Sequence, residues 1–150
     1  MLGAKGNNGV AALIDQTPGA LGYVESGYAE LAGLSMAAVE NRRGRFILPT
    51  VASGQAALAG AELPANFRLF IPDPAGENAY PIVTYTWILV LKRYDSPRKA
   101  HWLRRVLLYG LTEGQQFSEK LGYIPLPKNI TDRVIPAVKQ IEPHGERDGE

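Results

Sequence analysis

The sequence has 150 residues, of which 45% are hydrophobic and 21% are charged, and its formal net charge is +1. A chain of this length and composition can bury a sizeable core, and its length predicts one domain. The near-neutral charge gives no broad electrostatic attraction to nucleic acid or to an anionic membrane. The sequence contains no cysteine, which excludes disulfides and thiolate chemistry and leaves the compartment open.

The first half of the sequence predicts short elements separated by glycine and proline. We predict helices over residues 10–16, 26–34 and 50–58. We predict strands over residues 20–24, 36–40, 45–48 and 67–71. A turn at residues 41–44 joins two of these strands, with Gly44 available where a positive φ is needed.

The stretch from Tyr80 to Leu91 is the most apolar part of the sequence and carries no charge. It is rich in β-branched and aromatic residues, and both alternating sets of side chains are mostly apolar. Strands covered on both faces by helices have this composition. About ten residues are half of what a membrane-spanning helix needs. The stretch therefore predicts a buried central strand.

The second half predicts long amphipathic helices. Ser96 and Pro97 form a helix start, and the apolar residues that follow have helical spacing. Thr112 and Gln115 resemble a capping box that would restart the helix, and Gly122 would end it. A last helix is predicted over residues 127–141, with Pro136 inside it and expected to kink it. Alternating helices and strands predict α/β architecture with largely parallel or mixed sheets.

Few residues suggest chemistry. Gly3, Gly6 and Gly9 precede a helix, but their spacing matches neither the dinucleotide-binding fingerprint nor a P-loop, so an ordinary helix entry is expected. His101 and His144 lie far apart in the sequence, and His101 is expected to be a solvated helix residue. The sequence has no nucleophile elbow and suggests no Ser/His/Asp set, so no enzyme activity is predicted.

Two basic clusters occur. The first is Arg42, Arg43 and Arg45, interpreted as a solvated turn. The second spreads around a helix, and aromatic residues do not alternate with it as in a stacking platform, which argues against a nucleic-acid surface; it comprises Arg98, Lys99, Arg104 and Arg105. Asn129 begins a glycosylation sequon, but a helix start explains that residue as well. These residues assign no catalytic, ligand-binding or metal-binding site and no cofactor.

An ordered series of motifs nevertheless resembles the phosphate-binding proteins of bacterial ABC importers. The series comprises residues 5–10, 18–25, 46–50, 79–90, 111–115 and 121–127. Of these, Leu-Thr-Glu-Gly-Gln followed by Leu-Gly-Tyr-Ile-Pro-Leu-Pro is the most specific piece. The resemblance covers nearly the whole sequence and about the C-terminal half of such a protein.

The resemblance implies a partial periplasmic-binding-protein-like fold of type II. Residues 1–78 would complete the second lobe, and residues 79–150 would supply a hinge-crossing strand and the C-terminal helices of the first lobe. The implied function is the solute-binding component of phosphate import, acting by binding rather than catalysis. The implied location is the periplasm or cell envelope, although residues 1–6 lack the apolar stretch of a signal peptide and none is expected in this sequence.

The resemblance also implies that the phosphate-holding groups lie elsewhere. In the family these groups belong to a Thr-Phe-type turn, an aspartate and an Arg-x-x-Ser-Gly-Thr motif, and none of them has a match in this sequence. The implied partners are inorganic phosphate, the ABC permease subunits, and either a separate N-terminal half or a second copy of the chain. The alternative is a truncated or partner-dependent interaction or sensor module without its own ligand site.

Overall fold

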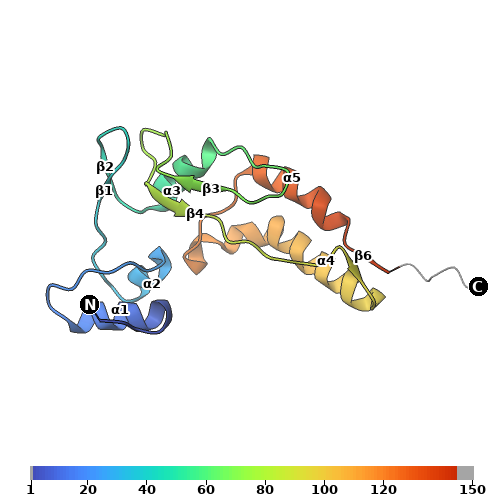
Figure 1. Ribbon diagram of the computed structural model, residues 1–150, viewed down its shortest axis with the longest axis horizontal. Helices are drawn as coiled ribbons and strands as arrows, with labels where there is room; N and C mark the ends of the chain where they lie inside the picture. The colour runs from blue at the N-terminus through green and yellow to red at the C-terminus, as the bar shows by residue number, and fades with distance from the viewer. Residues whose placement is uncertain (1, 145–150) are drawn as a thin grey trace, which may run out of the picture.

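Helices form most of the regular structure between residues 2 and 144, the part of the chain that the computed structural model describes. The α-helices are α1 (Gly6–Gln16), α2 (Ser26–Leu31), α3 (Val51–Ala59), α4 (Pro97–Leu111) and α5 (Lys128–Lys139). Two 3-10 helices, Glu113–Phe117 and Glu119–Leu121, follow α4. Figure 1 shows an elongated, open arrangement, with α1 and α2 at one end and α4 and α5 toward the other. None of these helices combines the length and the hydropathy needed to cross a lipid bilayer.

The predicted helix starts are confirmed where the local capping chemistry is complete. At α3, the Thr50 hydroxyl accepts a hydrogen bond from the Ser53 amide at 3.1 Å, and the Ser53 hydroxyl accepts one from the Thr50 amide at 2.9 Å. At α4, the Ser96 hydroxyl accepts from the Lys99 amide at 3.3 Å, and Pro97 occupies the first turn. Each cap satisfies an amide that the helix leaves without an internal partner.

The strands are short and pair two by two. They are β1 (Val39–Glu40), β2 (Phe46–Ile47), β3 (Phe70–Pro72), β4 (Ile82–Thr84), β5 (Arg93–Tyr94) and β6 (Glu142–Pro143). The pairs β1–β2 and β3–β4 are antiparallel, and β5–β6 is parallel. The mixture of helices and strands confirms the α/β class in its coarse sense. The predicted strand over residues 20–24 is wrong: that segment is irregular, and Leu21 is exposed.

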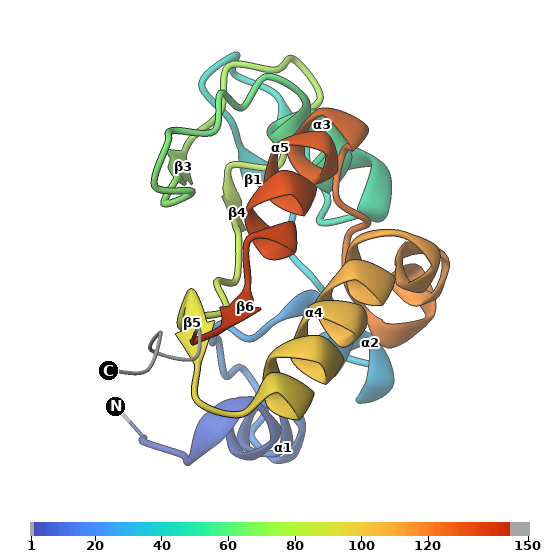
Figure 2. The same ribbon diagram turned by 90° about the vertical axis from the view of Figure 1, so that its right-hand side faces the viewer.

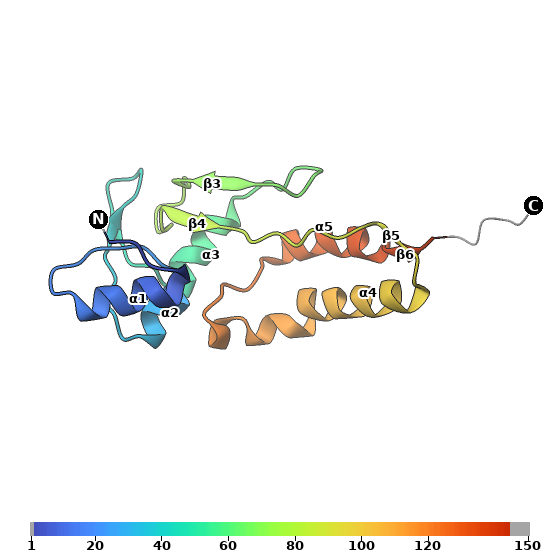
Figure 3. The ribbon, with the colours of Figure 1, turned by 60° about the horizontal axis from the view of Figure 1, so that its bottom comes forward.

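The prediction of a buried central strand over the apolar stretch is also wrong. Only Ile82–Thr84 has a strand partner, through the register in which Ile71 faces Val83. Beyond it, the chain runs on as an irregular segment to β5, beside α4 and α5 (Figures 1 and 3). The side chains from Ile88 to Leu91 are exposed. A strand is buried by its neighbours; here Tyr85 packs into a core cluster, but no strand pairs with the residues after Thr84 before β5.

The core consists of two small clusters. In the first, Leu58 of α3 and Leu63 pack with Tyr85 and with Ile130 of α5. In the second, α4 and α5 lie side by side (Figure 2) and bury four residues, namely Tyr94, Ala100, Val138 and Ile141. Because the first cluster draws on α3 and α5, it joins segments that are far apart in the sequence.

A close backbone approach links the α1–α2 end of the molecule to the segment after α4. Gly27 in α2 lies against Gly122, so that a Cβ added at Gly122 would lie 2.7 Å from the Gly27 Cα. Gly122 has a φ of 78°, which glycine adopts without steric cost, and it ends the second 3-10 helix as predicted. Only glycines allow this contact, because any side chain here would meet backbone.

The predicted capping box at Thr112 is wrong. The Thr112 hydroxyl turns back and donates to the Leu108 carbonyl at 2.8 Å, so it caps the end of α4 rather than the start of the next helix. The Gln115 side chain instead donates to the Gly110 carbonyl and accepts from the Leu126 amide. Gln115 therefore connects the end of α4 to the segment that leads into α5.

Candidate functional site

The turn between β1 and β2 carries the first basic cluster and lies against the loop between β3 and β4. The Nε of Arg42 lies 3.6 Å from a carboxylate oxygen of Asp73, and Arg45 pairs with Glu77. All four side chains are about half exposed or more. Surface ion pairs of this kind contribute only ~0–1 kcal/mol each, so they orient the turn more than they stabilise the chain.

Asn41, at the start of this turn, is the residue that holds the two loops together. It is only 4% exposed. Its side-chain amide donates to the carbonyls of Glu77 at 2.9 Å and Ala79 at 3.1 Å. Its side-chain oxygen accepts from the amides of Arg43 and Arg45. The sequence marked Asn41 only as a turn residue, because an asparagine before glycine does not reveal that it also bonds a segment more than thirty residues away.

A depression of about 460 Å³ opens between Arg43, Arg45 and Glu77. Two guanidinium groups would attract an oxyanion, but the Glu77 carboxylate already pairs with Arg45. The Nε of Arg43 donates to the Ala75 carbonyl at 3.2 Å, which uses one of its donors within the chain. The interpretation of this cluster as a turn is confirmed in its geometry, and the pairing argues against a ready-made anion site here.

A second depression, of about 500 Å³, lies beside the start of α3 and is lined mostly by apolar residues. A helix start can bind an anion through its free amides. At α3 the Ser53 amide donates to the Thr50 hydroxyl, and the Ser53 hydroxyl accepts from the Thr50 amide and donates to the Leu48 carbonyl at 2.6 Å. The Thr50 side chain therefore caps one of the amides at this helix start.

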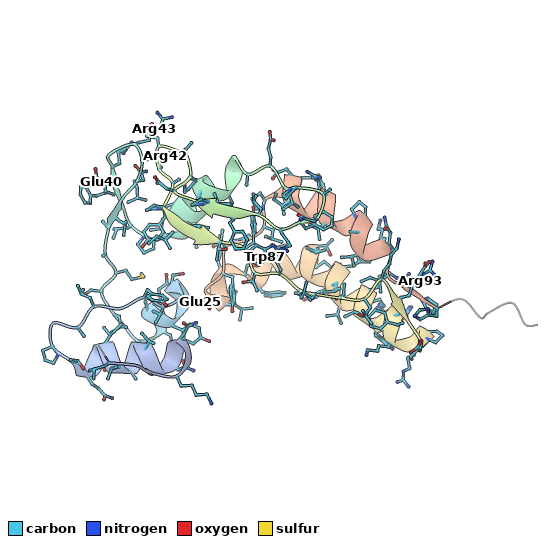
Figure 4. The ribbon with its side chains drawn as sticks, viewed as in Figure 1. Glu25, Glu40, Arg42, Arg43, Trp87 and Arg93 are labelled. Carbon is cyan, nitrogen blue, oxygen red and sulfur yellow. The ribbon has the colours of Figure 1, made fainter. Side chains whose placement is uncertain are left out.

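The second basic cluster contacts its own chain. The Nζ of Lys99 lies 5.4 Å from the Tyr94 ring, and the guanidinium of Arg105 lies 5.0 Å from the Trp102 ring. Arg104 donates to the Ile141 carbonyl at 3.2 Å. The cluster thus spreads along α4, as expected from the sequence. Figure 4 shows that Arg42 and Arg43 lie at one end of the molecule and Arg93 at the other, so the basic residues do not converge on one site.

The structure does not bring the two histidines together. The His101 ring packs edge-on against Trp102 at 5.5 Å, and the His144 Nε2 lies 3.8 Å from a carboxylate oxygen of Asp95. Among residues 2–144, no three histidine or carboxylate side chains gather as a metal site would require. Gly6 begins α1 with a φ of 68° and no side-chain cap precedes it, so the glycine motif forms a helix entry.

Tyr85 is the one side chain of the described residues whose buried hydroxyl has no hydrogen-bond partner. It lies in the first core cluster and is 9% exposed. Burial raises the pKa of the Tyr85 phenol, because the charged form loses its hydration. The residue was expected to be buried in the central strand, but its lack of a partner has no signal in the sequence.

Sequence comparison identifies relatives named phosphate-binding proteins. The "Phosphate-binding protein PstS" of Methanocaldococcus jannaschii is 36% identical over 152 residues, covering 92% of this chain and 39% of the relative. The protein of that name from Xylella fastidiosa strain 9a5c is 34% identical and is covered to 37%. The one from Pasteurella multocida is 28% identical and is covered to 39%. No family model matches the sequence.

The match covers nearly all of this chain but a minor part of each relative. The chain spans about two fifths of the length of the curated relatives that it matches. This agrees with the resemblance seen in the motifs, which covered most of the sequence. The 150-residue chain is therefore a partial PstS-like chain.

Proposed function

We propose that this chain contributes part of the solute-binding component of an ABC importer for inorganic phosphate. The observation that carries the proposal is the match of 88–94% of the chain to proteins named for phosphate binding. The component acts by binding rather than catalysis and delivers phosphate to the permease subunits of the importer. Its place of action is the periplasm or the cell envelope.

The chain contributes to both lobes of a periplasmic-binding-protein-like fold of type II. Residues 1–78 belong to the second lobe, and residues 79–150 supply the hinge strand and helices of the first. The separation of α1 and α2 from α4 and α5 supports this division (Figure 1). The β3–β4 ladder and the first core cluster join the two parts across this boundary.

Phosphate is held by groups outside this sequence. Of the chain's candidate donors, Arg45 pairs with Glu77, and the Ser53 amide at the start of α3 donates to the Thr50 hydroxyl. At the β1–β2 turn, an oxyanion would have to compete with the Glu77 carboxylate for Arg45. The chain alone therefore does not bind phosphate with useful affinity.

A chimera tests this function. The matching segment of the Methanocaldococcus jannaschii protein, 39% of its length, is replaced by this chain, with the unaltered protein as control. Titration calorimetry with inorganic phosphate should show binding by the chimera and none by the chain alone. Micromolar binding by the chain alone would contradict the assignment of the ligand groups. A folded chimera without phosphate binding would favour an interaction or sensor module instead.

A further inference from the structure

Helix α4 has an outer face that the rest of the described chain leaves largely uncovered. Its inner face packs against α5 through residues such as Ala100 and Leu103. Figures 1 and 3 show α4 along an outer edge of the molecule, with α5 on its inner side. On the opposite side, Trp102 is 51% exposed, Val106 is 64% exposed and Tyr109 is 50% exposed. The α4 outer face comprises residues spaced mainly by three or four positions, which a helix places together, namely Arg98, Lys99, Trp102, Arg105, Val106 and Tyr109.

The α4 outer face concentrates positive charge. The helix contains four Arg or Lys residues and no Asp or Glu, so its formal charge is +4 in a chain whose net charge is +1. The near-neutral total therefore conceals a locally basic surface. Arg104 turns toward the Ile141 carbonyl. Among residues 2–144, none of the other three cations, Arg98, Lys99 and Arg105, forms an ion pair.

Two of these cations lie beside aromatic rings. The Arg105 guanidinium lies 5.0 Å from the Trp102 ring, and the Lys99 Nζ lies 5.4 Å from the Tyr94 ring. Such contacts orient the cation but leave its positive charge unneutralised, because the ring carries no net charge. Tryptophan and tyrosine favour the headgroup level of a lipid bilayer, where one end of the ring is apolar and the other is hydrated. Basic residues next to exposed aromatic rings are therefore typical of a helix that lies on a membrane surface.

We propose that the α4 outer face docks on the surface of a membrane that contains anionic lipids. The helix has 15 residues and is about 22 Å long, so it lies along the surface and does not enter the bilayer end-on. The Trp102 and Tyr109 rings sit at the level of the headgroups. Arg98, Lys99 and Arg105 contact the lipid phosphate groups. The inference goes beyond the proposed function, which only places the chain near a permease in a membrane, and it does not require the binding of inorganic phosphate.

The charge and shape of the α4 outer face favour lipid over two other occupants. The remaining polypeptide of a phosphate-binding protein would have to bury three cations that have no acidic partner on the helix, and Arg and Lys are almost never fully buried unless they are paired. A protein partner with an acidic surface would attract the cations, but protein interfaces hold aromatic anchors in well-packed pockets. A bilayer surface accepts a convex helix face without a pocket.

Vesicle sedimentation tests the inference in the absence of inorganic phosphate. The chain and the chimera are each mixed with vesicles of phosphatidylcholine alone and with vesicles that also contain phosphatidylglycerol. Both proteins should bind the anionic vesicles at least about tenfold more strongly at about 0.1 M salt, and the preference should fall at about 0.5 M salt because salt screens exposed charges. Equal binding to the two kinds of vesicle overturns the inference. Binding by the chain but not by the folded chimera also overturns it, because the remaining polypeptide then covers α4.

Charge-neutralising variants locate the binding surface. Glutamine preserves the helix propensity of Arg and Lys. Each Lys or Arg near an anionic surface strengthens binding roughly fivefold, so the loss of three should weaken it roughly 100-fold. The variant carries Arg98→Gln, Lys99→Gln and Arg105→Gln. A control with the same net charge carries substitutions of three exposed basic residues in other segments, namely Lys5→Gln, Arg68→Gln and Lys120→Gln. Equal weakening by the two variants contradicts a binding surface on α4.

Tryptophan fluorescence tests whether the helix meets the headgroups. The sequence contains two tryptophans, Trp87 and Trp102. On anionic vesicles the emission of the wild type should move to shorter wavelength, because the exposed Trp102 ring leaves water. The Trp102→Phe variant should show no such shift, because Trp87 already packs against the first core cluster. An equal shift in this variant, or no shift in the wild type, overturns the placement of the α4 outer face on the bilayer.

These outcomes separate the inference from the proposed function. A chimera that binds anionic vesicles but not inorganic phosphate overturns the function and keeps the inference. A chimera that binds inorganic phosphate but not anionic vesicles does the reverse. Absence of vesicle binding together with binding to an acidic protein identifies a protein partner for α4 and overturns the inference as well.

Discussion

Two buried polar side chains differ in whether their hydrogen-bonding groups have partners. Asn41 uses both its donor and its acceptor groups, and through them it fixes the β1–β2 turn on the β3–β4 loop. The Tyr85 hydroxyl has no partner. An unsatisfied buried group costs about 1–3 kcal/mol, so Tyr85 destabilises the isolated chain while its ring fills the core.

The variant Tyr85→Phe should show this cost. Near pH 7 its free energy of unfolding should equal or exceed that of the wild type by up to about 1 kcal/mol. The folded-state pKa of Tyr85 is raised above 10.0, so the neutral form favours folding below that pH. As the pH rises above about 10, the wild type should lose stability relative to the variant.

Urea unfolding near pH 7 and above pH 10 checks both parts of this prediction. Tyr123→Phe, at a tyrosine that is 56% exposed, serves as control for the loss of a hydroxyl. A loss of stability near pH 7 in the Tyr85 variant alone would reveal a partner for the hydroxyl that the structure does not show.

Elements whose ends are set by adjacent residues were predicted correctly from the sequence. Elements that need partners from distant parts of the chain were not. The start of α4 is set by Ser96 and Pro97, which are adjacent to the helix. The apolar stretch after β4 has strand composition, but burial requires other strands, and the described chain brings none beside it. Thr112 had the spacing of a cap, yet its hydroxyl reached the carbonyl one turn back.

The candidate site was predictable only in part for the same reason. That Arg42, Arg43 and Arg45 form a turn follows from the adjacent glycine. Their pairing with Asp73 and Glu77 depends on a loop about thirty residues away, which the sequence does not place. The expectation that the phosphate-holding motifs lie elsewhere came from the family resemblance rather than from spacing.

Alanine variants can test how much the close approach of Gly27 and Gly122 stabilises the chain. Gly122→Ala adds a Cβ at a positive φ and places it 2.7 Å from the Gly27 Cα. Gly33→Ala is a matched control, because Gly33 has a φ of 66° and nothing within 4 Å of an added Cβ. Both variants should lose about 1 kcal/mol from the positive φ, and Gly122→Ala should lose more through the backbone clash.

The difference between the urea midpoints of Gly122→Ala and Gly33→Ala measures how much the Gly27–Gly122 contact stabilises the chain. Hydrogen exchange in α1 and α2 should also quicken in the Gly122 variant, because the contact joins that end to the rest of the chain. Equal losses in the two alanine variants would show that the close approach contributes nothing to stability.

At the scale of the whole molecule, the two core clusters are small and the surface is large. In the described residues no large side chain is completely buried, and many apolar side chains are half exposed or more. Such a chain buries little apolar surface for each residue that it orders. Its stability should therefore depend on an added partner more than on its own interior.

The urea m-value of the isolated chain tests how much surface the folded chain buries. The urea m-value scales with the surface exposed on unfolding, and small proteins have values of about 1–3 kcal/mol per molar urea. The isolated chain should have an m-value well below that of a compact protein with 150 residues. An m-value typical of a compact protein of this size would show that the chain closes into a self-contained fold.

The first core cluster limits where recombination can divide the gene for such a chain. Leu58 and Leu63 precede the proposed lobe boundary, whereas Tyr85 and Ile130 follow it. A recombination breakpoint at the boundary would leave each daughter gene with one side of an apolar contact and no interior to bury it. Selection for foldable products would therefore favour exchange of the two pieces together, across the proposed lobe boundary.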